Sequence, residues 1–138
     1  MPITAILFLF TFFIASSAHA QLNGCAYCNP VITGITQFGD GSNCEIGFGA
    51  SSNVSGNGLC VRDYHWTVVP DPQNSYISRR SSDGQFANIK FFADGVYTVC
   101  VTVTTWFDAD GDGVKDANEM CVSDPMCTTV TINGCDGY

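Results

Sequence analysis

Apolar and polar residues alternate with a period of two along most of the chain after residue 30. In the segment Val96–Phe107 the two sets of alternate positions are Tyr97, Val99, Val101 and Val103 on one face, and Thr98, Cys100, Thr102 and Thr104 on the other. This pattern predicts a strand with one face in the core and one in water. The segment Cys60–Val69 alternates in the same way, which predicts that Trp66 is a core residue on a central strand.

Similar segments recur along the chain. They are rich in Val, Thr, Ile, Phe and Tyr, and Gly, Asn, Asp and Pro gather between them. The predicted strands are Val31–Phe38, Cys44–Ala50, Cys60–Val69, Ser75–Arg79, Gln85–Phe92, Val96–Phe107 and Cys127–Ile132. About seven short strands at this spacing predict an all-β fold, an antiparallel β-sandwich.

The first twenty residues differ from the rest. Residues 1–20 hold no Asp, Glu, Lys or Arg, and their apolar run ends in Ala18-His19-Ala20, a small-x-small pattern. We therefore predict a removed secretory signal at 1–20 and a single domain at 21–138. Two alternatives are a membrane anchor, for which the apolar run is short, and lipidation of Cys25 in a lipobox-like Leu22-Asn23-Gly24-Cys25.

The cysteines indicate the compartment in which the protein folds, and the net charge excludes some classes of partner. All eight cysteines follow the predicted signal, which indicates disulfides formed in an oxidising, extracellular compartment. Cys100 and Cys127 fall on the outward faces of two strands expected to pair, so we predict a cross-strand disulfide between them. The pair Cys25 and Cys28 is expected to be a structural staple, because no thioredoxin-like or zinc-finger context surrounds it. A net charge of −8 argues against nucleic acid and anionic membrane as partners.

Several strands resemble those of PKD-type domains, which are immunoglobulin-like sandwiches of extracellular proteins. The similarity lies in Gly95-Val96-Tyr97-Thr98-Val99, in Tyr64-x-Trp66, in Cys44–Phe48 and in the final Thr128–Ile132. It spans roughly residues 44–132, and it departs from the family in lacking Phe-Gly-Asp-Gly after Trp66. The resemblance implies contacts with extracellular protein or carbohydrate, and it assigns no residues to them.

One segment carries the residues of a metal site. Asp108–Glu119 matches the twelve-residue calcium loop, with carboxylates of Asp108, Asp110 and Asp112 at positions 1, 3 and 5 and Gly113 at position 6. The other predicted Ca²⁺ ligands are the carbonyl of Val114, Asp116 through water, and Glu119. Strand-forming residues precede the loop and Lys115 stands at position 8, so we predict a lone calcium loop between the last two strands, not a paired EF-hand.

These observations predict a secreted, non-enzymatic, calcium-binding module with a role in adhesion, matrix or surface binding. Self-assembly is one form of this role. The alternative is a small secreted hydrolase or inhibitor stabilised by calcium. A catalytic triad could use His65, the one histidine after the predicted signal, but no Gly-x-Ser-x-Gly elbow accompanies it. The segment Asn53-Val54-Ser55 is a glycosylation sequon.

Overall fold

The computed structural model describes residues 24–41, 43–55, 60–70, 75–108 and 110–135. The predicted signal at 1–20 lies outside these residues. The described chain contains one short helix, α1 (Gly24–Tyr27), and eight strands. The strands are β1 (Ile32–Phe38), β2 (Glu45–Ser52), β3 (Val61–Val69), β4 (Ser75–Arg79), β5 (Phe86–Phe91), β6 (Gly95–Trp106), β7 (Met120–Val122) and β8 (Met126–Ile132).

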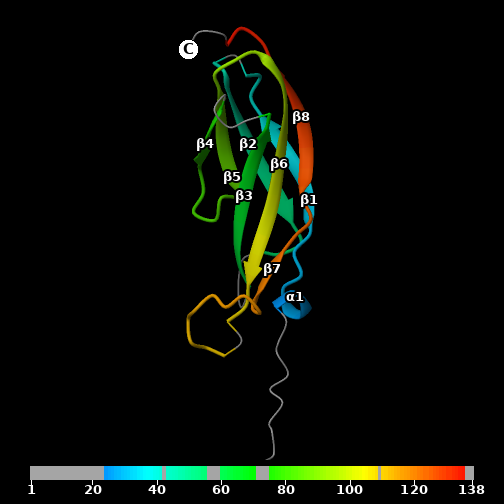
Figure 1. Cartoon of the computed structure of the whole chain (residues 1–138), viewed down its shortest axis with the longest axis vertical. Coiled ribbons are helices and arrows are strands. Elements are labelled where there is room, and N and C mark those ends of the chain that lie inside the picture. Colours follow the sequence, from blue (N-terminus) through cyan, green and yellow to red (C-terminus); the bar gives the residue numbers. More distant parts are fainter. Residues whose placement is uncertain (1–23, 42, 56–59, 71–74, 109, 136–138) are drawn as a thin grey trace, which may run out of the picture.

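The strands form two antiparallel sheets that pack face to face as an elongated sandwich (Figure 1). One sheet has the order β1-β2-β5-β4, and in the other β6 pairs with β3 along one side and with β7 and β8 along the other. With β7 and β8 counted as one strand, this is the ABED and CFG arrangement of an immunoglobulin-type sandwich. The predicted all-β, antiparallel sandwich is confirmed.

The core lies between the sheets and consists of the apolar sets expected from the alternation. Val99, Val101 and Val103 of β6 are fully buried, as are Ile89 and Phe91 of β5. Aromatic pairs join the two layers: Phe48 lies 5.9 Å from Trp66 and Phe91 lies 4.8 Å from Tyr97, measured between ring centroids. Each such pair stabilises the fold by more than the burial of its apolar area alone would provide.

One prediction about the second sheet is wrong. Trp66 is buried as expected, but among the described residues β3 pairs with β6 alone, so it is an edge strand and not a central one. The predicted last strand is present as β8, and it is preceded by β7, which was not predicted; both follow the same side of β6, with a break at 123–125. Pro125 has no backbone N–H, and Ser123 bridges the break by bonding the N–H and the C=O of Val103.

The predicted cross-strand disulfide is present. Cys100 and Cys127 are direct partners in the register of β6 and β8, and their sulfur atoms are bonded, with the Cα atoms 4.0 Å apart. Three further disulfides, whose pairing the sequence left open, join Cys25 to Cys121, Cys28 to Cys60 and Cys44 to Cys135. The staple role of Cys25 and Cys28 is confirmed, although they lie on and beside a helical turn that we did not expect. The disulfide of Cys25 also leaves no thiol there for lipidation.

Candidate metal centre

The predicted calcium loop closes the hairpin between β6 and β7. Trp106 and Met120 are the last paired residues, and the N–H of Phe107 donates to the carbonyl of Glu119 at 3.1 Å. The loop therefore begins and ends at two neighbouring points of one ladder. It projects from the end of the sandwich where α1 lies, opposite the C-terminal end of the described chain (Figure 1). Residues 117–119 form a turn, and no helix follows them among the described residues.

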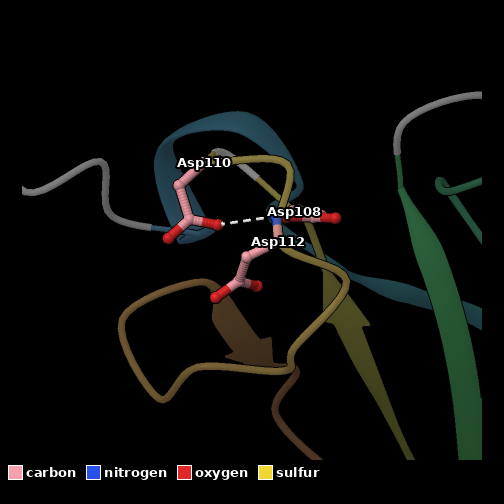
Figure 2. Close-up of side chains that lie close together, drawn as sticks. All are labelled: Asp108, Asp110 and Asp112. Atoms are coloured by element: carbon pink, nitrogen blue, oxygen red, sulfur yellow. Dashed lines mark hydrogen bonds between the residues drawn. The ribbon is translucent and has the colours of Figure 1, made fainter.

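The side chains of Asp108, Asp110 and Asp112 come together within this loop (Figure 2). One carboxylate oxygen from each can be chosen so that all three lie within 4.8 Å of one another. Each carboxylate also accepts backbone N–H groups of the loop: Asp108 from Gly111 and Gly113, Asp110 from Asp112, and Asp112 from Val114, at 2.7–3.1 Å. These short-range bonds are all made within the loop itself.

Glycine at two loop positions allows this path. Gly111 and Gly113 have φ of 75° and 74°, a left-handed conformation that residues with a Cβ adopt at a cost. Gly113 is position 6 of the predicted calcium loop, where the chain must turn sharply. The reason for glycine at this place is therefore backbone conformation, because a Cβ there would meet no neighbouring atom.

The carboxylates of the loop repel one another. The N–H of Asp112 lowers the pKa of Asp110, but lost solvation and the charges of Asp112, Glu119 and Asp108 outweigh it, so this pKa is raised. The raised pKa means that the negative charges of the neighbouring carboxylates oppose the loss of the proton from Asp110. A cation among these oxygens would remove the repulsion.

The remaining predicted ligands lie outside the three-carboxylate cluster. Val114 is exposed, and its N–H binds Asp112. Asp116 is half-buried, and its carbonyl accepts the N–H of Glu119 at 3.0 Å. Glu119 is only 3% exposed, and its charge is close enough to Asp110 to affect the pKa of that group. Of the six predicted ligands, the structure thus brings together Asp108, Asp110 and Asp112.

Three residues that hold the loop were not expected from the sequence. The indole Nε1 of Trp106 donates to Oε2 of Glu119 at 3.1 Å, which orients the carboxylate that the pattern assigns to position 12. The ammonium of Lys115 lies 5.5 Å from the centroid of the same indole ring. Phe107, at the entrance to the loop, stacks on Tyr27 of α1 with the ring centroids 5.0 Å apart. The aromatic pair Trp106-Phe107 directly before Asp108 is the sequence signal that could have indicated this support.

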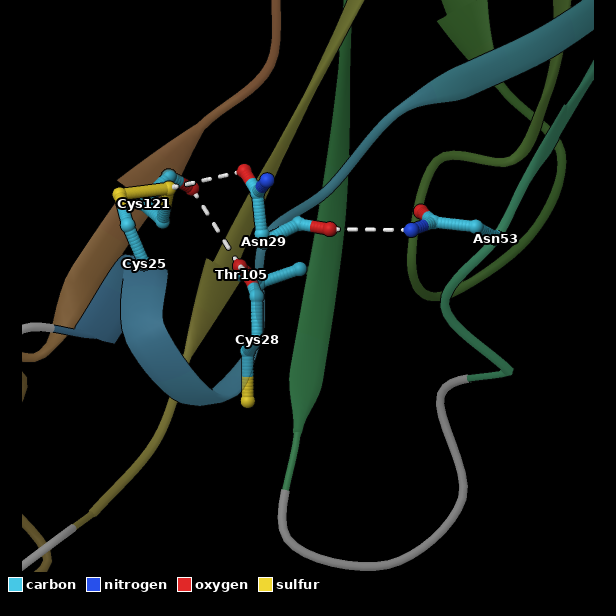
Figure 3. Close-up of a disulfide and its surroundings, with 6 residues drawn as sticks. All are labelled: Cys25, Cys28, Asn29, Asn53, Thr105 and Cys121. Atoms are coloured by element: carbon cyan, nitrogen blue, oxygen red, sulfur yellow. Dashed lines mark hydrogen bonds between the residues drawn. A yellow bond between two sulfur atoms is a disulfide. The ribbon is translucent and has the colours of Figure 1, made fainter.

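The base of the hairpin is tied to the N-terminal segment (Figure 3). The disulfide between Cys25 and Cys121 joins α1 to β7, and Thr105 of β6 donates its hydroxyl to the carbonyl of Cys28. Asn29, the next residue, accepts from the side-chain amide of Asn53 at 3.0 Å. The sequon residue Asn53 therefore clamps the start of β1, since its other amide atom accepts the N–H of Val31.

The chemistry of the donor set fits a hard divalent cation. The three gathered side chains offer carboxylate oxygens only, and Ca²⁺ takes six to eight oxygen ligands in flexible geometry. Within the described residues this is the one group of His, Cys, Asp or Glu side chains arranged to hold a metal ion. Asp108, Asp110 and Asp112 would bind the ion directly, and the ion would supply a positive charge that orders the loop.

No protein-family model, curated protein or solved structure matches the chain. Within the described part of the chain, no helix has the length and apolar character needed to cross a membrane.

Proposed function

We propose that this chain is an extracellular, calcium-stabilised β-sandwich module without catalytic activity. The observation that carries the calcium proposal is the convergence of Asp108, Asp110 and Asp112 at the end of a hairpin. Their spacing, with Gly113 and Glu119, is that of a calcium loop, and the hydrogen bonds within the loop already bring the carboxylates together. The proposed role of the ion is structural.

The extracellular location is supported by the disulfides. Four disulfides in a chain of this length are typical of secreted proteins, because thiols stay reduced in the cytosol. The immunoglobulin-type strand order, with Trp66 and Tyr97 in its core, supports placing the domain with PKD-type modules. From that placement we infer a role in adhesion, matrix or surface binding, with extracellular protein or carbohydrate as partner and self-association as one form.

The alternative is a small secreted hydrolase or inhibitor that is stabilised by the same ion. It draws on His65 and Asp63, whose side chains lie 3.4 Å apart on the outer face of β3 beside a hollow of about 210 Å³. The residues that line this hollow include Thr104 but neither serine nor cysteine. The carboxylate of Asp63 also forms an ion pair with Arg79, so it is not available to His65 alone. We therefore prefer the non-enzymatic role, and the hydrolase stays the second candidate.

Calcium should stabilise the folded protein. The purified domain is melted in calcium chloride and in EDTA, and we expect calcium to raise the melting temperature. At a calcium concentration about 100-fold above Kd, the gain in unfolding free energy is about 2.7 kcal/mol, or roughly 10 °C. Magnesium should have a smaller effect, because it gives up its water reluctantly.

The substitution Asp108→Ala should abolish the difference between calcium and EDTA, since it removes the ligand at position 1. Asp124→Ala is the matched control, because it deletes an exposed carboxylate beyond the loop and should keep the full calcium effect. Equal melting temperatures of the unaltered domain in calcium and in EDTA would show that the loop has no such role.

A further inference from the structure

The outer face of the β1-β2-β5-β4 sheet is not flat. Two hollows of about 490 and 290 Å³ lie on it, and they share Phe38, Gly47 and Asn88, so they are parts of one depression. A third hollow of about 230 Å³ adjoins them through Glu45 and Asn88 and reaches Tyr76 of the edge strand β4. The depression therefore crosses the whole width of the sheet.

Glycine forms the floor of this depression. Gly47 and Gly49 occupy successive outward positions of β2, where a side chain would otherwise fill the space. The rings of Phe38 and Phe86 lean over Gly49, and a Cβ there would come within 3.0 Å of both. At Gly47 an added Cβ would lie 3.4 Å from its nearest neighbours, in Asn88 and Phe38, so even a small side chain there would fill the floor between them.

Aromatic rings line the depression and remain exposed to water. The exposed fractions are 49% for Phe38, 43% for Phe86 and 63% for Tyr76. The rings of Phe38 and Phe86 lie 6.3 Å apart between centroids. The largely exposed apolar side chains of the other sheet are instead aliphatic, as at Val61, Val69 and Val96. Exposed aromatic rings gathered on one face of a small acidic protein indicate a binding surface, because their contact with water is unfavourable.

Polar side chains stand between the rings. The amide of Asn88 donates to the carboxylate of Glu45, and this pair lies beside Gly47. Asp40 and Glu45 supply negative charge to the depression, whereas Lys90 and Arg80 supply positive charge. The charges on the face thus balance, although the chain as a whole has a net charge of −8. An uncharged ligand fits this face, and a polyanion would be repelled by the rest of the protein.

We propose that this face binds a neutral oligosaccharide. A sugar ring has an apolar C–H face, which fits the exposed face of Phe38 or Tyr76, and a rim of hydroxyl groups. Glu45 and Asn88 offer hydrogen-bond acceptors and donors to those hydroxyls, in the mixture of apolar walls and few polar groups that is usual for ligand sites. The proposal names the partner class of the extracellular role proposed above, and it uses no residue of the calcium loop.

The test is isothermal titration of the calcium-loaded domain with neutral hexasaccharides: cellohexaose, mannohexaose, maltohexaose and chitohexaose. At least one should bind at millimolar concentration or below, and heparin fragments of the same length should not. Phe38→Ala and Tyr76→Ala should each lower the affinity about tenfold, which is about 1.4 kcal/mol. Val96→Ala is the matched control, because it removes a largely exposed apolar side chain on β6 of the other sheet, outside this face.

A second variant separates loss of binding from loss of folding. Gly47→Val fills the floor with a residue that favours strands, so the variant should stay folded, with a melting temperature close to that of the parent, while binding is lost. Failure of all four hexasaccharides to bind, or binding that Gly47→Val and Tyr76→Ala leave unchanged, would overturn the proposal. So would a dimer in sedimentation velocity that Tyr76→Ala dissociates, because the face would then hold a second copy of the chain.

The calcium effect is measured on the same samples. If sugar binding is absent and calcium still raises the melting temperature, only the oligosaccharide proposal fails. If sugar binds and calcium has no effect on melting, only the calcium proposal fails.

Discussion

Asp83 lies in the connection between β4 and β5 and joins both sheets through its side chain and backbone. Its carboxylate accepts from Arg62 of β3 at 3.0 Å, from the hydroxyl of Ser81 and from the N–H of Gln85. Partial loss of solvation acts to raise the pKa of Asp83, but these hydrogen bonds and the charge of Arg62 outweigh it, and the pKa is lowered. The Asp83 carbonyl also accepts the N–H of Tyr64 at 2.7 Å.

The lowered pKa of Asp83 predicts a dependence of stability on acid. Because the folded-state pKa is below the unfolded value, the stabilisation is complete above the unfolded pKa and is lost as the pH falls through the folded pKa. Asp83→Asn should lower the free energy of unfolding by about 1–3 kcal/mol at neutral pH. The difference from the parent should shrink in strong acid, where both side chains are uncharged.

Urea unfolding in EDTA at neutral pH and in strong acid measures this change, and EDTA keeps calcium from adding its own pH dependence. Asp124→Asn is the control, since Asp124 is an exposed carboxylate in the break between β7 and β8. A destabilisation by Asp83→Asn that is as large in strong acid as at neutral pH would contradict the prediction.

At the scale of elements, β6 is the strand on which the second sheet depends. It pairs with β3 on one side and with β7 and β8 on the other, and its twelve residues extend from the corner after β5 to the base of the loop. Near its start the hydroxyl of Tyr97 donates to the carbonyl of Ala93, four residues earlier, at 2.9 Å. This is the geometry of the tyrosine corner of immunoglobulin-type sandwiches, and it fixes the turn from one sheet to the other.

Removing the hydroxyl alone tests the corner. Tyr97→Phe keeps the buried ring, whose exposed fraction is 2%, and should lower the free energy of unfolding by about 1 kcal/mol through the lost hydrogen bond. Tyr76→Phe is the matched control, because Tyr76 is largely exposed and its substitution should leave stability nearly unchanged. Equal midpoints for the two variants in guanidinium unfolding would show that the corner bond contributes nothing.

At the scale of the whole molecule, the disulfides connect parts of the chain that are far apart in sequence. Cys44–Cys135 joins the start of β2 to the segment after β8 across 91 residues, whereas Cys100–Cys127 spans 27 residues within one ladder. Cys135 is fully buried, and its N–H donates to the carboxylate of Asp94. The long link therefore closes the end of the sandwich that lies opposite the calcium loop.

The loops that the disulfides close predict similar contributions from the two links. While the other links stay in place, the Cys25–Cys121 disulfide shortens the chain path from Cys44 to Cys135 to about 33 residues, against 27 from Cys100 to Cys127. In the chain-entropy view, Cys44→Ala with Cys135→Ala and Cys100→Ala with Cys127→Ala should therefore each cost about 4 kcal/mol. Denaturant unfolding of the two double variants measures the costs, and peptide mapping without reduction checks that the other three links remain. A much larger loss for the Cys100 and Cys127 pair would mean that local strand pairing, and not loop closure, governs these contributions.

The sequence alone determined the β-sandwich, the buried face of β6 and the Cys100–Cys127 pair. All three follow from a period of two, which is a local property of the strand. It also determined the place and the first three carboxylates of the candidate calcium loop, because Asp108, Asp110 and Asp112 fold onto backbone groups within a few residues of themselves.

Only the tertiary structure decided which distant segments meet. The edge position of β3 and the link from Cys25 to Cys121 rest on contacts that no local pattern encodes. The depression over Gly47 depends on the same kind of information, since Phe38 and Asn88 come from different strands. Local hydrogen bonding and side-chain alternation depend only on short stretches of sequence. The order of strands in a sheet depends instead on how all the apolar faces are buried together.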